Sequence, residues 1–170
     1  MSIECVMNRR SVREYTEAAV SDEQVKALLT AGMYAPSARN SQPWEFVVVR
    51  DREKLKKLSA GAPFWKMLEK APLAIVVTAN LEDYKSSTPG FFIQDCSACT
   101  QNILVAAEGS GLGGVWLGLY GVQERMDYVR ETLNIPEAIQ PFSLISLGVP
   151  ARHPRPHTSF YQEKVHYESY

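Results

Sequence analysis

Residues 36–44, Pro-Ser-Ala-Arg-Asn-Ser-Gln-Pro-Trp, form a polar stretch between a predicted amphipathic helix and a predicted apolar strand. A short turn would join two such elements, yet this stretch carries two prolines, two serines, an arginine and an amide pair. Proline fixes the backbone, while Ser, Asn and Gln side chains both donate and accept hydrogen bonds. The stretch therefore indicates either a rigid loop that holds a flat, polar ligand or simply a helix stop followed by a polar loop.

Hydrophobic periodicity predicts the elements around this stretch. Apolar residues at helical spacing, behind a capping box at Ser21 and Gln24, predict a helix over residues 22–34. Apolar, often valine-rich runs predict buried strands at 44–49, 73–79, 115–117 and 142–149. Further helices are expected at 3–10, from Asp51 onward, at 64–69, at 93–108 and at 123–133. Residues 80–90 are polar and form the expected place for a substrate-side lid or an unresolved loop.

The helix predicted at 93–108 is apolar or small on nearly all sides, which is typical of a helix buried on nearly all sides. A chain of this size covers such a helix more readily when a second subunit contributes. Residues 151–170 form an extended, aromatic-rich tail that needs a surface, and a partner subunit would provide one. Residues 1–170 are otherwise expected to form a single domain.

Composition limits the classes of function. The chain has 45% apolar and 22% charged residues, and its net charge of −1 argues against nucleic acid or acidic membranes as partners. Three cysteines, an odd number, favour a reducing compartment over a disulfide framework. Because no signal peptide and no apolar run of bilayer length is visible, we expect a cytoplasmic protein.

Two short motifs suggest chemistry that their context argues against. Gly109, Gly111 and Gly114 form G-x-G-x-x-G, but here the glycines close a helix and open a strand, the reverse of the dinucleotide-binding order. They indicate a tight turn, or close approach of the backbone to a planar ligand, or both. Cys96 and Cys99 lie inside the apolar helix, so we interpret them as core residues and expect no metal site.

The sequence offers no evident nucleophile or acid–base pair of its own. Asp95 could be a catalytic carboxylate, but an acid favoured by the helix dipole in the first turn is the simpler interpretation. The cluster Arg9-Arg10-Ser11-Val12-Arg13 can bind phosphate through charge-assisted hydrogen bonds, or it can be a solvated surface run. Cationic, amide and glycine elements together suit an enzyme whose cofactor carries the chemistry.

Several of these stretches together resemble the nitroreductase family of FMN-dependent NAD(P)H oxidoreductases. The likeness runs from residue 4 to about residue 167. Residues 9–15 (RRSVREY) are similar to the family's N-terminal R-R-S-x-R motif, and residues 35–44 (APSARNSQPW) to its A-P-S-x-x-N-x-Q-P-W motif. Residues 95–102 and 106–116 resemble its central helix and the turn that leaves it, and 147–150 the exit of its last strand.

The resemblance implies particular roles for the N-terminal cluster and the polar loop. Arg9 and Ser11 would hold the FMN phosphate and ribityl chain, with Arg10 beside them, and Arg13 would face the N1/O2 edge of the ring. Loop residues would line the ring or reach it from the opposite subunit: Pro36, Ser37, Ala38, Asn40 and Gln42.

The remaining implied contacts come from the glycine turn and the tail. Gly113 and Gly114 would approach the ring with their main chain and donate a hydrogen bond towards N5. Family members commonly carry a cation in the tail just before an aromatic residue, but this chain has Thr158-Ser159-Phe160 there. Arg155, or Arg152, is the expected substitute.

As a whole, the resemblance implies an α+β sandwich with a central, mostly antiparallel sheet, in an intertwined homodimer with exchanged tails and two interfacial FMN sites. It further implies NADH or NADPH as co-substrate, ping-pong hydride transfer through flavin N5, and a nitroaromatic, quinone or similar small-molecule acceptor. Other flavin chemistry, such as dehalogenation or flavin fragmentation, and non-catalytic FMN binding or sensing stay open as alternatives.

Overall fold

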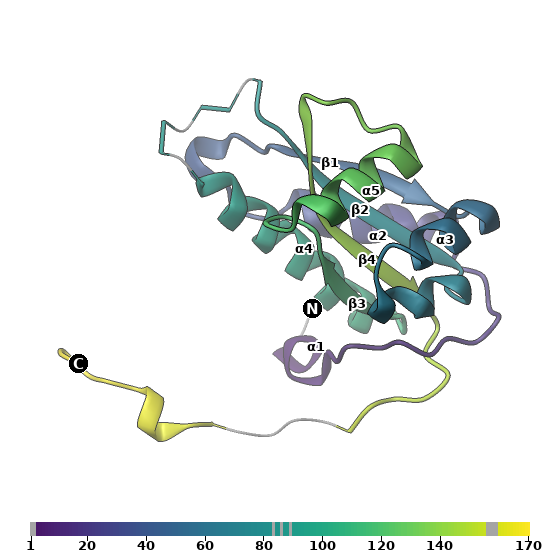
Figure 1. The fold of residues 1–170 in the computed structure, drawn as a ribbon. Helices are drawn as coiled ribbons and strands as arrows, with labels where there is room; N and C mark the ends of the chain where they lie inside the picture. Colours follow the sequence, from purple (N-terminus) through teal and green to yellow (C-terminus); the bar gives the residue numbers. More distant parts are fainter. Residues whose placement is uncertain (1–2, 83, 86, 89, 156–159) are drawn as a thin grey trace.

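The core of the protein is a sheet of four strands. The computed structural model describes residues 3–82, 84–85, 87–88, 90–155 and 160–170 (Figure 1). All neighbouring strands are antiparallel, in the order β1-β2-β4-β3. Their bounds are Trp44–Val49 for β1, Leu73–Asn80 for β2, Gly113–Gly118 for β3 and Ile139–Gly148 for β4.

Helices cover both faces of this sheet. The α-helices are α1 (Ile3–Asn8), α2 (Asp22–Met33), α3 (Arg52–Ser59), α4 (Phe91–Gly109) and α5 (Gln123–Leu133). Short 3-10 helices are η1 (Ala38–Asn40), η2 (Pro63–Glu69) and η3 (Gln162–Lys164). The capping box predicted for α2 is confirmed, because Ser21 Oγ accepts from Gln24 N at 3.2 Å and Gln24 Oε1 accepts from Ser21 N at 3.0 Å.

Alternate residues of β2 enter two separate apolar cores. Ile75 and Val77 pack with residues of α2 and α4, while Ala74 and Val76 pack with residues of α3 and α5. Since side chains alternate along a strand, one central strand serves both layers. The result is a helix–sheet–helix sandwich (Figure 1), which confirms the predicted α+β class.

Within the chain, α4 packs on the sheet, on α2 and on α1, so much of its apolar surface needs no second subunit. At Gly32 of α2, a Cβ atom would lie 3.0 Å from Ile103 and 3.1 Å from Cys99, so glycine permits this close helix crossing. Cys96 and Cys99 are free and fully buried, and burial raises the pKa of the Cys96 thiol to about 12. They are core residues, as the sequence indicated.

The C-terminal tail leaves the body of the molecule after β4. Its last described segment, residues 160–170, lies away from the sheet and helices in Figure 1. Phe160 and Tyr167 are 78% and 73% exposed. Aromatic side chains at this level of exposure are candidates for burial against another surface. That this surface belongs to a partner subunit stays a prediction.

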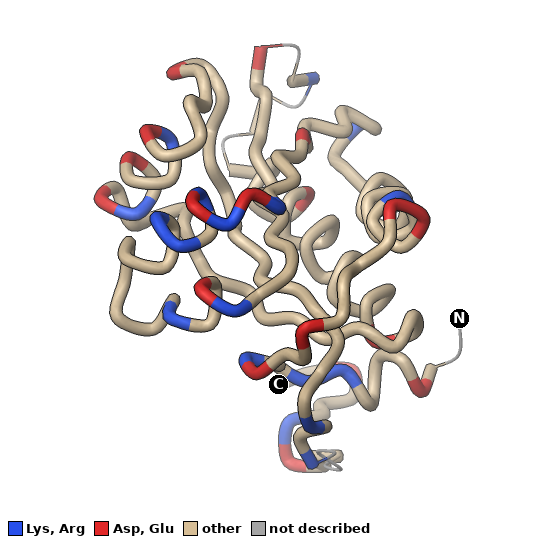
Figure 2. Tube along the Cα trace, turned by 90° about the vertical axis from the view of Figure 1, so that its right-hand side faces the viewer, with Lys and Arg blue, Asp and Glu red and all other residues tan. Residues whose placement is uncertain are grey.

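Charges of both signs are distributed over the chain. Lys and Arg alternate with Asp and Glu in Figure 2, consistent with the net charge of −1. Among the described helices, none is both long and apolar enough to cross a membrane.

Candidate cofactor site

Residues 9–13, here named the arginine–serine segment, lie along the beginning of β3. Ser11 forms an isolated parallel bridge with Gly114, and Val12 N donates to Gly114 O at 3.0 Å. The Tyr15 hydroxyl lies 2.9 Å from both Val12 O and Ser146 Oγ, and burial raises the pKa of Tyr15 above its ordinary value. Backbone pairing and the Tyr15 contact together fix the course of this segment. Tyr15 was quoted in the motif, but its structural role was not predicted.

Arg9 has the feature expected of an anion ligand. Its Nε is buried and has no hydrogen-bond partner among the residues that the structure describes. A buried, unpaired N–H is costly, and a bound anionic group would satisfy it. Ser11 and Arg13, two and four positions further along the chain, are exposed and line a small pocket of about 200 Å³ together with Glu14 and Arg152. The guanidinium and hydroxyl donors of residues 9–13 suit a phosphate monoester.

The other arginines near this pocket interact mainly with the protein itself. Arg10 donates from Nη1 to Met7 O and Arg9 O, both at 2.7 Å, and from Nε to Arg155 O at 3.1 Å. Arg152 forms an ion pair with Glu14 at 2.8 Å. Arg152 and Arg155 of the tail therefore lie near the N-terminal arginines. This position is the one that a tail residue would need in order to contact the same anion. Residues 156–159, with the Thr158-Ser159 departure, lie outside the described residues.

Gly113 and Gly114 are required by packing within the chain. A Cβ at Gly113 would lie 2.6 Å from Val12 Cγ2, and one at Gly114 would lie 2.9 Å from the backbone oxygen of Ser146. Only glycine therefore fits this crossing of three segments without displacement of backbone. The turn before them uses Gly111 at φ +72°, and it leads from α4 into β3. This order confirms that the G-x-G-x-x-G pattern is not a dinucleotide-binding turn.

The polar loop of residues 36–42, here named the 36–42 loop, has an unusual backbone. Arg39, Asn40 and Gln42 have φ of 52°, 52° and 48°, the left-handed region that non-glycine residues rarely adopt. Ser37 Oγ accepts from Gln42 N at 3.0 Å and holds the loop ends together. Backbone strain of this kind is found at ligand-binding segments because the surrounding structure must maintain it. Pro36, Asn40 and Gln42 are exposed, and Ser37 and Ala38 are partly buried.

Asp95 anchors this loop, and its predicted position was wrong. It is the fifth residue of α4, so it lies beyond the first turn, and it is 5% exposed. Its Oδ1 accepts from Ala38 N at 2.9 Å and its Oδ2 accepts from the Tyr84 hydroxyl at 2.7 Å. The pKa of Tyr84 is raised by burial and by this carboxylate. Sequence reasoning missed Tyr84, because no local pattern marks a contact between a loop and a distant helix.

The predicted cofactor residues form two groups at opposite ends of α4 (Figure 1). The 36–42 loop contacts Asp95 near the start of the helix, while Ser11 and Gly114 lie just beyond its end at Gly109. With a rise of 1.5 Å per residue, Asp95 and Gly109 are about 21 Å apart. These two groups of predicted cofactor residues, here named the half-sites, therefore do not meet within one chain.

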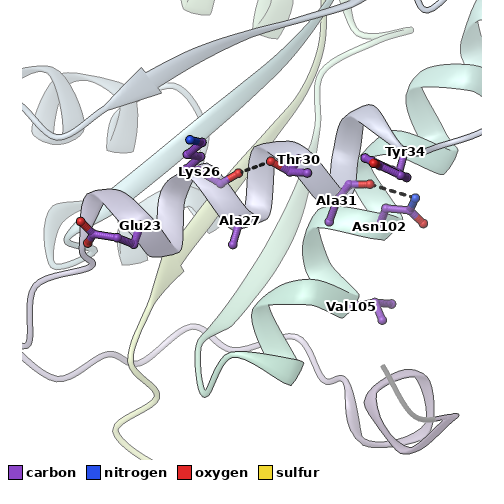
Figure 3. A pocket seen from close by; sticks show the side chains of 8 residues that line it. All are labelled: Glu23, Lys26, Ala27, Thr30, Ala31, Tyr34, Asn102 and Val105. Atoms are coloured by element: carbon purple, nitrogen blue, oxygen red, sulfur yellow. Dashed lines mark hydrogen bonds between the residues drawn. The ribbon is translucent and has the colours of Figure 1, made fainter.

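An apolar hollow of the surface lies apart from both half-sites. It is a groove of about 690 Å³. Its lining side chains come from α2, from Tyr34 just after it and from α4 (Figure 3). The groove is lined by Glu23, Lys26, Ala27, Thr30, Ala31, Tyr34, Asn102 and Val105. Of the described residues that line it, none is a predicted cofactor residue.

An α+β sandwich with an arginine–serine anion pocket and a strained polar loop defines a protein that binds a phosphorylated, planar cofactor. The model of the nitroreductase family matches residues 6–62 and 59–149, and the chain belongs to this family.

Individual relatives are similar over nearly the whole chain. A protein of Archaeoglobus fulgidus, provisionally named an NADH dehydrogenase/NAD(P)H nitroreductase, is 50% identical over 87% of this chain and 84% of its own. A Clostridium acetobutylicum structure, provisionally described as an NADH oxidase, has a TM-score of 0.93 at 41% identity, covering 98% of this chain and 99% of its own. A Desulfovibrio desulfuricans relative, solved in complex with FMN, has a TM-score of 0.85 at 31% identity, covering 99% of this chain and 96% of its own.

Proposed function

We propose that this protein is an FMN-dependent oxidoreductase that uses NADH or NADPH to reduce nitroaromatic, quinone or related small-molecule acceptors by a ping-pong reaction. The observation that carries the proposal is the buried Nε of Arg9, which has no hydrogen-bond partner among the described residues and belongs to the segment that pairs with Gly114 through Ser11. The FMN-bound relative and the NAD(P)H nitroreductase name of another relative support it.

Within this proposal the chain binds and orients the cofactor. Arg9 and Ser11 hold the phosphate, because a guanidinium and a hydroxyl donate charge-assisted hydrogen bonds to it. The exposed guanidinium of Arg13 would face the ring edge that gains negative charge on reduction, and would stabilise that charge. FMN, when bound, would supply the redox chemistry between the nicotinamide and the acceptor, for which the sequence offers no evident nucleophile or acid–base pair of its own. No side chain is required as the acid, since solvent can supply protons.

The working protein in this proposal is a homodimer. Because the half-sites lie about 21 Å apart along α4, one complete site takes the 36–42 loop from one subunit and the arginine–serine segment from the other. Two such sites arise when the α4 helices of two copies lie antiparallel. The apolar groove of Figure 3 and the 84% exposed Tyr34 at its edge are surfaces for the partner and its exchanged tail.

The visible spectrum of the purified protein, before and after anaerobic addition of NADH or NADPH, tests the proposal. We expect a yellow protein that either nicotinamide bleaches, and restoration of the colour by a nitroaromatic or quinone. A yellow protein that neither nicotinamide bleaches would contradict the enzyme and favour a flavin-binding protein. A colourless protein that FMN does not reconstitute would contradict the cofactor assignment.

A further inference from the structure

Asp95 is a buried carboxylate that forms no ion pair with any Lys or Arg in the described part of the chain. A buried charge without a cation depends on its hydrogen-bond donors, and the two donors here come from different segments. Ala38 N lies in the 36–42 loop, and the Tyr84 hydroxyl belongs to the segment between β2 and α4. Loss of either donor would leave the carboxylate incompletely satisfied. The carboxylate therefore favours the state in which both segments are in place.

A second contact joins the same two segments independently. Lys85 N donates to Ser41 Oγ at 3.2 Å, and Ser41 Oγ also lies 2.6 Å from Ala38 O. Tyr84 is further held by an edge-to-face contact with Phe92, whose ring centroid is 6.5 Å away and whose side chain is buried. The hydroxyl of Tyr84 is thus directed at Asp95 by packing on α4 as well as by its hydrogen bond.

We infer that Asp95 is a positioning residue that joins the 36–42 loop to Tyr84 and Lys85, so that the two segments keep or lose their geometry together. The backbone of the loop supports this inference. Arg39, Asn40 and Gln42 are left-handed, and such a conformation persists only where surrounding contacts maintain it. The bond from Ala38 N to Asp95 is the contact directly before these residues.

A consequence for the cofactor follows and rests on the proposed function. Asn40 and Gln42 would meet FMN only while the loop keeps its shape, so Asp95 and Tyr84 would raise FMN affinity without touching it.

Two measurements distinguish the coupling between the 36–42 loop and the Tyr84–Lys85 segment from the proposed function in FMN chemistry. Amide hydrogen exchange at Ala38 and Lys85, measured in the cofactor-free protein, reports the coupling whether or not FMN is the ligand. The dissociation constant of FMN, measured by flavin fluorescence, reports its consequence. If wild-type protein binds no FMN, the proposed function fails and the exchange data still decide the inference.

The variants are Asp95→Ala, Asp95→Asn, Tyr84→Phe and the double variant Asp95→Ala/Tyr84→Phe. We expect Asp95→Ala to speed exchange at both amides at least tenfold and to weaken FMN binding about tenfold. Asp95→Asn keeps an acceptor for Ala38 N and should stay within about threefold of wild type in both readouts. Tyr84→Phe should speed exchange at both amides by a smaller factor, and should add little in the Asp95→Ala background. Since Asp95→Ala removes both contacts, it is the variant most at risk of misfolding; in that case Tyr84→Phe decides, and wild-type exchange at Ala38 in that variant would overturn the inference.

Thr100→Val is the matched control, because Thr100 is buried on the same helix and bonds Cys96 O and Ser143 Oγ instead of either segment. It should lower stability and leave relative exchange at Ala38 and Lys85, and FMN affinity, unchanged. The inference is overturned if Asp95→Ala frees the Ala38 amide while Lys85 exchanges as in wild type. Strictly multiplicative effects of Asp95→Ala and Tyr84→Phe would overturn it too.

Discussion

The two ends of α4 are built in different ways. At its C-terminal end, the arginine–serine segment is fixed by main-chain pairing with Gly114 and by glycines at which a side chain would collide. At its N-terminal end, the 36–42 loop is left-handed at three non-glycine residues and is held by side-chain hydrogen bonds, among them the one to the carboxylate of Asp95. The first half-site is thus part of the sheet, while the second is a strained loop held by side chains. We expect substitutions at the first end to cost stability and substitutions at the second end to change geometry.

The largest effect is expected from Gly114→Ala. Its Cβ would lie 2.8 Å from Leu147 and 2.9 Å from Ser146 O, and a backbone oxygen in a sheet cannot move away. Overpacking of this kind costs about 2–3 kcal/mol, measured as the free energy of unfolding in urea. Gly118→Ala on the same strand is the control, because nothing lies within 4 Å of its added Cβ and it should be close to neutral. Equal losses in the two variants would show that β3 does not need glycine for packing.

Arg9→Ala should weaken FMN binding about tenfold to hundredfold. A hydrogen bond to a charged group contributes roughly 1.5–3 kcal/mol, and removal of the guanidinium leaves the phosphate without it. Isothermal titration of the apoprotein with FMN measures the change. Arg50→Ala removes the same charge from a surface ion pair with Asp22 and should leave the affinity unchanged. Similar losses in both variants would attribute the effect to net charge.

Tyr15→Phe should lower the free energy of unfolding by about 1 kcal/mol at pH 7, since Val12 O and Ser146 Oγ lose a common partner. Burial raises the pKa of Tyr15 in the folded state. Above about pH 10 the unfolded chain therefore releases this proton while the folded chain keeps it, and wild-type stability falls. The phenylalanine variant lacks this loss. The difference in unfolding free energy between wild type and variant should therefore shrink between pH 9 and pH 11, measured by urea unfolding. A difference that is constant or grows over this range would contradict the assignment.

The smallest effect is expected from Arg39→Gly. Glycine adopts φ of +52° without steric cost, so the exchange should stabilise the protein by roughly 0.5 kcal/mol despite the added chain entropy. Arg39→Val is the opposing variant, because a β-branched residue is least tolerated at positive φ. Thermal unfolding should rank the two variants above and below wild type. The reverse ranking would show that the loop is not left-handed at this position in solution.

The sequence predicted the elements that depend on local pattern. Helix α2 with its capping box and strand β2 follow from periodicity, because both signals lie within a few residues. The start of β4 was missed, since Pro141 argues against a strand. The structure pairs Pro141 with Thr78 beside a register shift between Val77 and Thr78, and such an irregularity tolerates a residue without an N–H.

The candidate site was predictable to a similar extent. The arginine–serine segment and the 36–42 loop were recognisable as motifs in the sequence. The contacts that hold the two segments in place were not. Asp95 receives bonds from residues 57 and 11 positions away, and only the folded chain identifies such partners. Likewise, the collisions that require Gly113 and Gly114 come from three segments that meet only in the folded sheet.

The distance between the half-sites along α4 has a genetic consequence if the dimer is assembled as proposed. An Arg9→Ala chain and an Asn40→Ala chain would each form a homodimer in which both sites are damaged. In a mixed dimer, one site would collect both lesions and the other would be wild type throughout. Two alleles with weakened FMN binding should therefore complement each other when FMN is scarce. At an FMN concentration that leaves both homodimers largely empty, co-refolded chains should recover up to about one quarter of wild-type activity, because half of the dimers are mixed and each has one intact site.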